Sequence, residues 1–151
     1  LHGAGRSVDG AVHRVGGREL TRECRAIGRI DLAHAVVTKG HRLPVDYVIH
    51  VAVPTYQGHP SDLDLLEKTY QAAFALARQM RVGHLTVPAI GTGANGFPAG
   101  DATERAVEVL TREAQASGPV DRIDVVVLDP KTAAIYQDTL RHAGRAVGAG
   151  R

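Results

Sequence analysis

The sequence has few of the residues that form covalent links, thiolate metal sites or large aromatic clusters. It contains one cysteine, no tryptophan, four tyrosines and two phenylalanines. A single cysteine, Cys24, excludes an internal disulfide and a cysteine-based zinc site, which favours a reducing, cytoplasmic compartment. No apolar run approaches the length of a membrane span and no signal peptide precedes the first motif, so no membrane partner is expected.

A strong charge of either sign is also absent. The 18 basic and 16 acidic residues give a formal net charge of +2, spread along the chain without a basic run. This balance does not indicate a nucleic-acid partner. Five of the eight histidines, His34, His41, His59, His84 and His142, share no metal-ligand spacing, so no metal is expected. No cofactor is expected either. With 151 residues, of which 44% are apolar, the chain is typical of one globular domain with a real core.

Helical and strand-like patterns alternate along the chain. Strands are expected at residues 35–39, 47–53, 85–90 and 123–128, and the last of these is so apolar that it is expected at the sheet centre. The expected helices cover residues 8–27 with a break at Gly16-Gly17, Ser61 to Met80 with Ser61 as the N-cap, a stretch from about Asp101, and Asp129 through Leu140. The alternation predicts an α/β fold, a three-layer α/β/α sandwich with a mixed central sheet.

The opening segment, residues 7–13 with the sequence SVDGAVH, combines two chemical features. Asp9 and His13 are four residues apart at the start of a helix, so their side chains project from one face. Glycines lie just ahead of the helix, where free N–H groups and the helix dipole favour an anion. The segment predicts a phosphate cradle beside an acid/base pair, although each residue alone is equally typical of an ordinary first helical turn.

A second glycine loop, residues 91–98, follows the third expected strand. It formally matches G-x-G-x-x-G, so a dinucleotide-binding turn of an NAD-dependent oxidoreductase must be considered. Against that interpretation, the residues Phe97-Pro98 separate the third glycine from the next helix, and no hydride-transfer residues accompany the loop. The loop can wrap a phosphate with its N–H groups, or it is a turn without a ligand.

Two other residue types are interpreted as structural. His50 lies in the middle of an apolar strand and is expected to be a hydrogen-bonded core histidine. Cys24 lies on the apolar face of a helix without a Cys/His arrangement, so it is expected to pack in the core.

Together these segments resemble the macrodomain family of ADP-ribose-binding modules, from about Leu1 to Leu140. Within the family, the resemblance is to the branch that removes mono-ADP-ribose from acidic side chains and deacetylates O-acetyl-ADP-ribose. The matching motifs are Val8-Asp9-Gly10-Ala11-Val12-His13, Gly17-x-Glu19-Leu20, Glu23-Cys24, Thr38-Lys39-Gly40, Leu43-Pro44, Tyr47-Val48-Ile49-His50, Pro88-Ala89-Ile90, Thr92-Gly93 and Gly96-Phe97-Pro98.

The resemblance implies a role for each loop. ADP-ribose, free or attached to a protein, would be the ligand, and an ester at the distal ribose would be hydrolysed by a bound water without a metal. Asp9 and His13 would be the catalytic residues, with Asp9 or the substrate's own phosphate positioning the water. The implied ligand-binding residues are Gly5, Arg6, Ser7, Val8, Gly10, Ile90, Gly91, Thr92, Gly93, Ala94, Asn95, Gly96, Phe97 and Asp129.

The chain departs from the family pattern at three places. Arg6 and Ser7 stand in a lead that is usually a run of glycines, and Asn95 stands where an aromatic residue usually packs on the ribose. The first family strands, expected before Leu1, are absent, so an open sheet edge is expected that a missing segment or a partner chain covers. A non-catalytic ADP-ribose reader therefore remains an alternative to the hydrolase. The expected macrodomain covers residues 1–143, followed by a flexible tail at 144–151.

Overall fold

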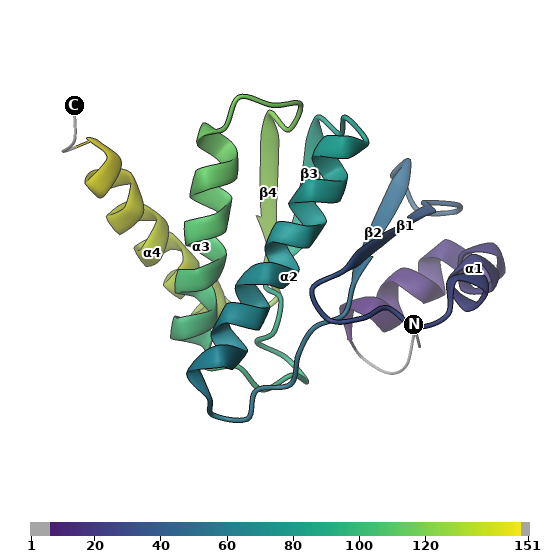
Figure 1. Cartoon of the computed structure of the whole chain (residues 1–151), viewed down its shortest axis with the longest axis horizontal. Helices are drawn as coiled ribbons and strands as arrows, with labels where there is room; N and C mark the ends of the chain where they lie inside the picture. The colour runs from purple at the N-terminus through teal and green to yellow at the C-terminus, as the bar shows by residue number, and fades with distance from the viewer. Residues whose placement is uncertain (1–6, 149–151) are drawn as a thin grey trace.

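Four helices and four strands alternate in a computed structural model that describes residues 7–148 (Figure 1). Their order along the chain is α1 (Val8–Ile27), β1 (Ala35–Lys39), β2 (Tyr47–Val51), α2 (Pro60–Gln79), β3 (His84–Pro88), α3 (Ala99–Gln115), β4 (Arg122–Val126) and α4 (Pro130–Gly148). Every expected strand and helix is present. The first helix and the first strand have their predicted bounds, most other boundaries differ by a few residues, and α4 continues eight residues beyond Leu140. The α/β prediction is therefore confirmed.

The strands form a mixed arrangement of two pairs. β1 and β2 are antiparallel, with Val37 opposite Ile49, whereas β3 and β4 are parallel, with Thr86 opposite Asp124. A single parallel bridge joins Leu32 to Ala52. Within residues 7–148 each strand has one partner strand, which agrees with the expectation of open sheet edges.

The β1–β2 pair lies between two helices, as the three-layer prediction requires. In Figure 1, α1 lies on one side of this pair and α2 on the other, next to α3. Successive residues of β2 point to opposite faces: His50 is buried toward Cys24 of α1, whereas Ile49 packs against the main core. That core is centred on the fully buried side chains of Leu66 and Phe74.

The prediction that the last strand is central is wrong for the part of the chain that the structure describes. β4 pairs with β3 alone, and its Val126 side chain is 52% exposed. Leu128, which was expected to end the strand, lies beyond it and is 87% exposed. Apolar residues on both faces of a strand are typical of burial on both faces, but here Ile123, Val125 and the following Val127 pack against the core while Val126 is exposed.

The prediction of Ser61 as the cap of α2 is also wrong, because His59 is the N-cap and Pro60 occupies the first helical position. The carboxylate of Asp62 accepts hydrogen bonds from the backbone N–H groups of His59 (3.0 Å) and Gln57 (2.8 Å). These two charge-assisted bonds hold the pKa of Asp62 below its ordinary value. An acidic third helical residue thus satisfies the helix start that Ser61 was expected to cap.

The first and last helices were expected to be interrupted at Gly16-Gly17 and to end before Gly144, respectively. The predicted break in the first helix is confirmed at Gly17, which has φ 82° and ψ −167° inside α1. The flexible tail expected from Gly144 differs from the structure, in which α4 remains helical to Gly148. None of the described helices combines the length and the apolar character that a membrane crossing requires.

Candidate functional site

The first turn of α1 presents an acidic side chain at the positive end of the helix. Ser7 caps the helix, and its hydroxyl oxygen accepts a hydrogen bond from the N–H of Gly10 (3.1 Å). Asp9 lies in this first turn with its side chain 41% exposed, whereas Gly10 is buried. The positive end of a 20-residue helix therefore lies beside a partly exposed carboxylate.

Asp9 and His13 lie together, as their spacing predicts. The Asp9 Oδ1 atom is 3.5 Å from Nε2 of His13, whose side chain is only 7% exposed. This separation exceeds a good hydrogen bond, and Nε2 is buried without a hydrogen-bond partner among residues 7–148. The imidazole therefore turns a ring nitrogen that has no hydrogen-bond partner among the described residues toward the Asp9 carboxylate.

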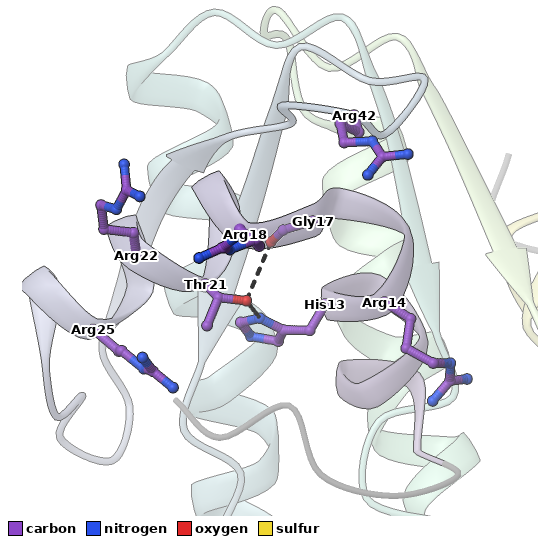
Figure 2. A pocket seen from close by; sticks show the side chains of 8 residues that line it. All are labelled: His13, Arg14, Gly17, Arg18, Thr21, Arg22, Arg25 and Arg42. Atoms are coloured by element: carbon purple, nitrogen blue, oxygen red, sulfur yellow. Dashed lines mark hydrogen bonds between the residues drawn. The ribbon is translucent and has the colours of Figure 1, made fainter.

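The other ring nitrogen of His13 is held by Thr21. Nδ1 lies 3.1 Å from the Thr21 hydroxyl oxygen, and that hydroxyl donates to the carbonyl of Gly17 (3.2 Å), as Figure 2 shows. A hydroxyl has one proton, and a carbonyl can only accept, so the Thr21 oxygen accepts from Nδ1–H. The Gly17 kink therefore fixes both the orientation and the tautomer of the imidazole, with Nε2 left toward Asp9.

The kink depends on glycine. At φ 82° Gly17 adopts a left-handed conformation that other residues rarely take, and a Cβ there would approach Cδ of Arg42 to 2.8 Å. The glycine pair in the sequence predicts the break, but the sequence pattern does not single out Thr21. Its place, four residues after the break and eight after His13, was the available signal.

The second glycine loop also depends on left-handed glycines. Gly91 has φ 91° and Gly96 has φ 75°, and a Cβ on Gly91 would lie 3.0 Å from the Phe97 ring. Phe97 is buried and its ring lies 5.2 Å from that of Tyr56. Because α3 begins at Ala99, beyond Phe97, the third glycine lies outside the helix, which disfavours a dinucleotide-binding turn.

Asn95 joins this loop to the segment that follows β2. Its side-chain amide nitrogen donates to the carbonyls of Val53 (3.2 Å) and Pro54 (3.1 Å). Its backbone carbonyl accepts a hydrogen bond from the N–H of Tyr56 (2.9 Å). The segments after β2 and β3 therefore run together at one end of the molecule (Figure 1). The side chain at this position anchors the loop instead of projecting an aromatic face.

Tyr70 of α2 holds the start of the second glycine loop from the core side. The sequence pattern does not single out this residue. Its hydroxyl oxygen accepts from the N–H of Ile90 (3.0 Å) and lies 3.5 Å from the hydroxyl of Tyr136. Burial raises the pKa of both phenols, so both stay neutral. Only a contact across 20 residues of sequence reveals this support, and no local pattern signals it.

The remaining predicted residues occupy several environments. Asp129 caps α4 by accepting from the N–H of Thr132 (2.8 Å), and that bond holds the pKa of Asp129 below its ordinary value. Val8 is exposed, Thr92 donates to the carbonyl of Ala89 (3.1 Å), and Gly93 has open space around it. Gly5 and Arg6 lie outside the described residues.

The structural roles of His50 and Cys24 are confirmed. His50 is 7% exposed, and its Nε2 lies 2.9 Å from the hydroxyl of Thr38 and 3.8 Å from the Cys24 sulfur. Burial lowers the pKa of His50 and raises that of Cys24. Among residues 7–148, no group of three or more His, Cys, Asp or Glu side chains is placed to hold a metal ion.

Comparisons with known proteins converge on one family. The Macro domain family model matches residues 1–106. The chain is 36% identical over 142 residues to the ADP-ribose glycohydrolase MACROD1 of Rattus norvegicus, which covers 91% of this chain and 55% of that relative. It is 34% identical over 141 residues to the O-acetyl-ADP-ribose deacetylase of Klebsiella pneumoniae, with 90% and 81% covered.

A solved structure shows the same architecture. The Oceanobacillus iheyensis macrodomain with ADP has a TM-score of 0.88 to this chain at 25% sequence identity. The likeness covers 94% of this chain and 78% of the other. The fold and the order of the motifs therefore agree with the same group of proteins.

Proposed function

Because this chain belongs to the macro domain family, we propose that it binds ADP-ribose and hydrolyses ADP-ribosyl esters. The substrates are mono-ADP-ribosylated acidic side chains or O-acetyl-ADP-ribose. Relatives named as an ADP-ribose glycohydrolase and an O-acetyl-ADP-ribose deacetylase support this class of substrate. A solved macrodomain with ADP supports a diphosphate ligand.

The observation that carries the hydrolase proposal is the pair of Asp9 and His13. Hydrolysis consumes one water, breaks the ester at the distal ribose and leaves ADP-ribose and a free carboxylic acid. Asp9, 41% exposed at the helix start, accepts a hydrogen bond from the attacking water. His13 Nε2, 3.5 Å from the same carboxylate, holds or returns a proton there while Thr21 keeps the ring in place.

The diphosphate site is proposed at two sets of backbone donors. One is the start of α1, where the helix dipole and the N–H groups after Ser7 favour an anion. The other is the loop from Ile90 to Phe97, in which Gly91 and Gly96 have left-handed backbone conformations. The N–H groups of Ile90, Gly96 and Phe97 donate within the protein, so the proposed phosphate donors are the N–H groups between Gly91 and Asn95. Asp129, at the start of α4, is proposed at the edge of the same site.

A reader of ADP-ribose without hydrolase activity is the second candidate, and one observation favours it. The Asn95 side chain is committed to the carbonyls of Val53 and Pro54, so no aromatic face is present at this position to pack on the ribose. Loose ribose positioning lowers the rate of hydrolysis more than it lowers the affinity for the diphosphate.

Two measurements separate the candidates. Calorimetry with ADP-ribose and with NAD tests binding. Tighter binding of NAD than of ADP-ribose would overturn the proposal that ADP-ribose is the ligand. Release of ADP-ribose from a mono-ADP-ribosylated protein then tests hydrolysis. Asp9→Ala is expected to reduce release by about 10²-fold or more while binding persists. Full activity of this variant would remove Asp9 from catalysis, and no release by the unaltered protein would favour the reader.

A cytoplasmic location is part of the proposal. It rests on the single cysteine, which is a buried free thiol in the described chain, and on the expectation that such proteins work in a reducing compartment.

A further inference from the structure

Four arginines of α1 and one from the loop between β1 and β2 gather around the kink of α1. They and their neighbours surround a pocket of about 530 Å³. Figure 2 shows them placed around Thr21 and His13. The arginines that form this arginine pocket are Arg14, Arg18, Arg22, Arg25 and Arg42.

The positive charge of the arginine pocket is largely uncompensated. Arg18, Arg22, Arg25 and Arg42 are all exposed, and no guanidinium among these four forms an ion pair or side-chain hydrogen bond with another residue of the 7–148 segment. Two acidic side chains of α1 lie nearby: Glu19, which neighbours Gly17, and Glu23, which is committed to His41 and to the N–H of Lys39. Neither forms an ion pair with Arg18, Arg22, Arg25 or Arg42 within the described residues. Like charges held this close repel one another, so a bound anion is favoured there.

The arginine pocket adjoins the proposed reaction site. His13, which faces Asp9 through Nε2, is also part of the pocket wall, and Thr21 lines the pocket beside it. An anion in the pocket therefore lies next to the group whose ester is hydrolysed. This position suits the part of a substrate that extends beyond the ribose, which is the modified protein.

We propose that the arginine pocket docks an acidic segment of the ADP-ribosylated protein, with carboxylates on Arg18, Arg22 and Arg25. The identity of this segment as substrate rests on the proposed function. Arg18 and Arg22 are one helical turn apart, about 6 Å along the axis. Alternate side chains of an extended peptide are about 6.6 Å apart, so an acidic residue at every second position matches these guanidiniums. Guanidinium and carboxylate groups also match as paired donors and acceptors.

A nucleic acid fits the arginine pocket less well. Among the described residues that line it there is no Phe, Tyr or Trp, so it lacks the large aromatic rings on which successive bases usually stack. The formal net charge of the whole chain is only +2, which gives little long-range attraction for a polyanion. A pocket of this size accommodates a few side chains rather than a length of duplex.

The direct test is binding of an unmodified, fluorescently labelled peptide with glutamate at every second position. A matched peptide with glutamine in place of glutamate is the ligand control. The variant Arg18→Gln/Arg22→Gln is expected to raise the Kd for the glutamate peptide by roughly five- to tenfold. The control variant Lys68→Gln/Lys131→Gln removes the same charge from exposed positions on α2 and α4, and it is expected to leave the Kd within about twofold.

Three results would overturn the acidic-segment proposal: equal affinity for both peptides, an equal loss in the control variant, or stronger competition by single-stranded DNA than by the glutamate peptide. The last result would assign the pocket to nucleic acid. Calorimetry with free ADP-ribose on the same variants keeps the two proposals apart. Retained ADP-ribose binding with no peptide preference refutes only the pocket. A peptide preference without ADP-ribose binding refutes only the proposed function.

A catalytic readout then links the pocket to the reaction. Two substrates are compared, in each of which one central glutamate carries the ADP-ribosyl ester and the alternate flanking residues are either glutamate or glutamine. The arginine variant is expected to raise KM for the glutamate-flanked substrate severalfold and to leave kcat within about twofold. Equal KM values for both substrates in the unaltered protein would contradict the link.

Discussion

Replacing Thr21 by valine tests whether the kink of α1 fixes the tautomer of His13. The substitution keeps the shape of the side chain and removes the hydroxyl that joins Nδ1 of His13 to the carbonyl of Gly17. With its acceptor gone, the neutral ring is expected to move its proton to Nε2, which faces the Asp9 carboxylate at 3.5 Å.

The size of the stability effect follows from burial. The His13 side chain is 7% exposed, so a lost partner at Nδ1 is not replaced freely by water, and such a loss costs about 1–3 kcal/mol. For a domain of this length, that loss lowers Tm by about 3–9 °C. Thr139→Val is the matched control, because the Thr139 hydroxyl donates to the carbonyl of Ile135 without a histidine partner. It is expected to lower Tm by no more than a few degrees, about 1 kcal/mol or less.

The assay is ¹⁵N–¹H correlation of the imidazole nitrogens at about pH 8.5, where ordinary imidazoles are neutral. The unaltered protein is expected to show His13 protonated at Nδ1, Thr21→Ser to preserve that signal, and Thr21→Val to shift it to Nε2. Hydrolysis is expected to slow in Thr21→Val with ADP-ribose affinity nearly unchanged. A proton on Nε2 in the unaltered protein, or on Nδ1 in Thr21→Val, would refute the role of the kink.

Three further predictions concern the core histidine and the second glycine loop. Burial lowers the pKa of His50, so as the pH drops the unfolded chain binds a proton at this residue before the folded protein does. The free energy of unfolding should therefore fall as pH drops below about 6.5, by at most about 1.4 kcal/mol per pH unit. Urea unfolding at two pH values should show a smaller fall in His50→Gln, and an identical fall would contradict this role. Gly91→Ala, strained at φ 91°, should lower Tm, whereas Gly93→Ala, with open space around it, should leave Tm unchanged and weaken ADP-ribose binding in calorimetry. Unchanged affinity in Gly93→Ala would place the phosphate elsewhere. Asn95→Ala leaves the carbonyls of Val53 and Pro54 without their donor and should destabilise the protein by about 1–3 kcal/mol in urea unfolding; a neutral result would show that the loop does not depend on this anchor.

The sequence alone determined the features that depend on neighbours along the chain. The order of helices and strands follows from the period of the apolar residues, and the break at Gly17 follows from a glycine pair inside a helical pattern. The approach of Asp9 to His13 follows from the helical repeat, which places residues four apart on one face. The family resemblance followed from the same ordered motifs.

The tertiary structure decided the features that depend on contacts between distant segments. Thr21 meets His13 only because α1 bends, and Tyr70 reaches Ile90 only because α2 packs beside β3. The apolar pattern of β4 predicted a central strand, but a pattern reports which residues prefer burial and not whether a partner covers them. Likewise, a net charge of +2 spread along the sequence does not reveal that five arginines gather around one kink. Local periodicity fixes the elements and their faces, whereas their packing decides which side chains meet.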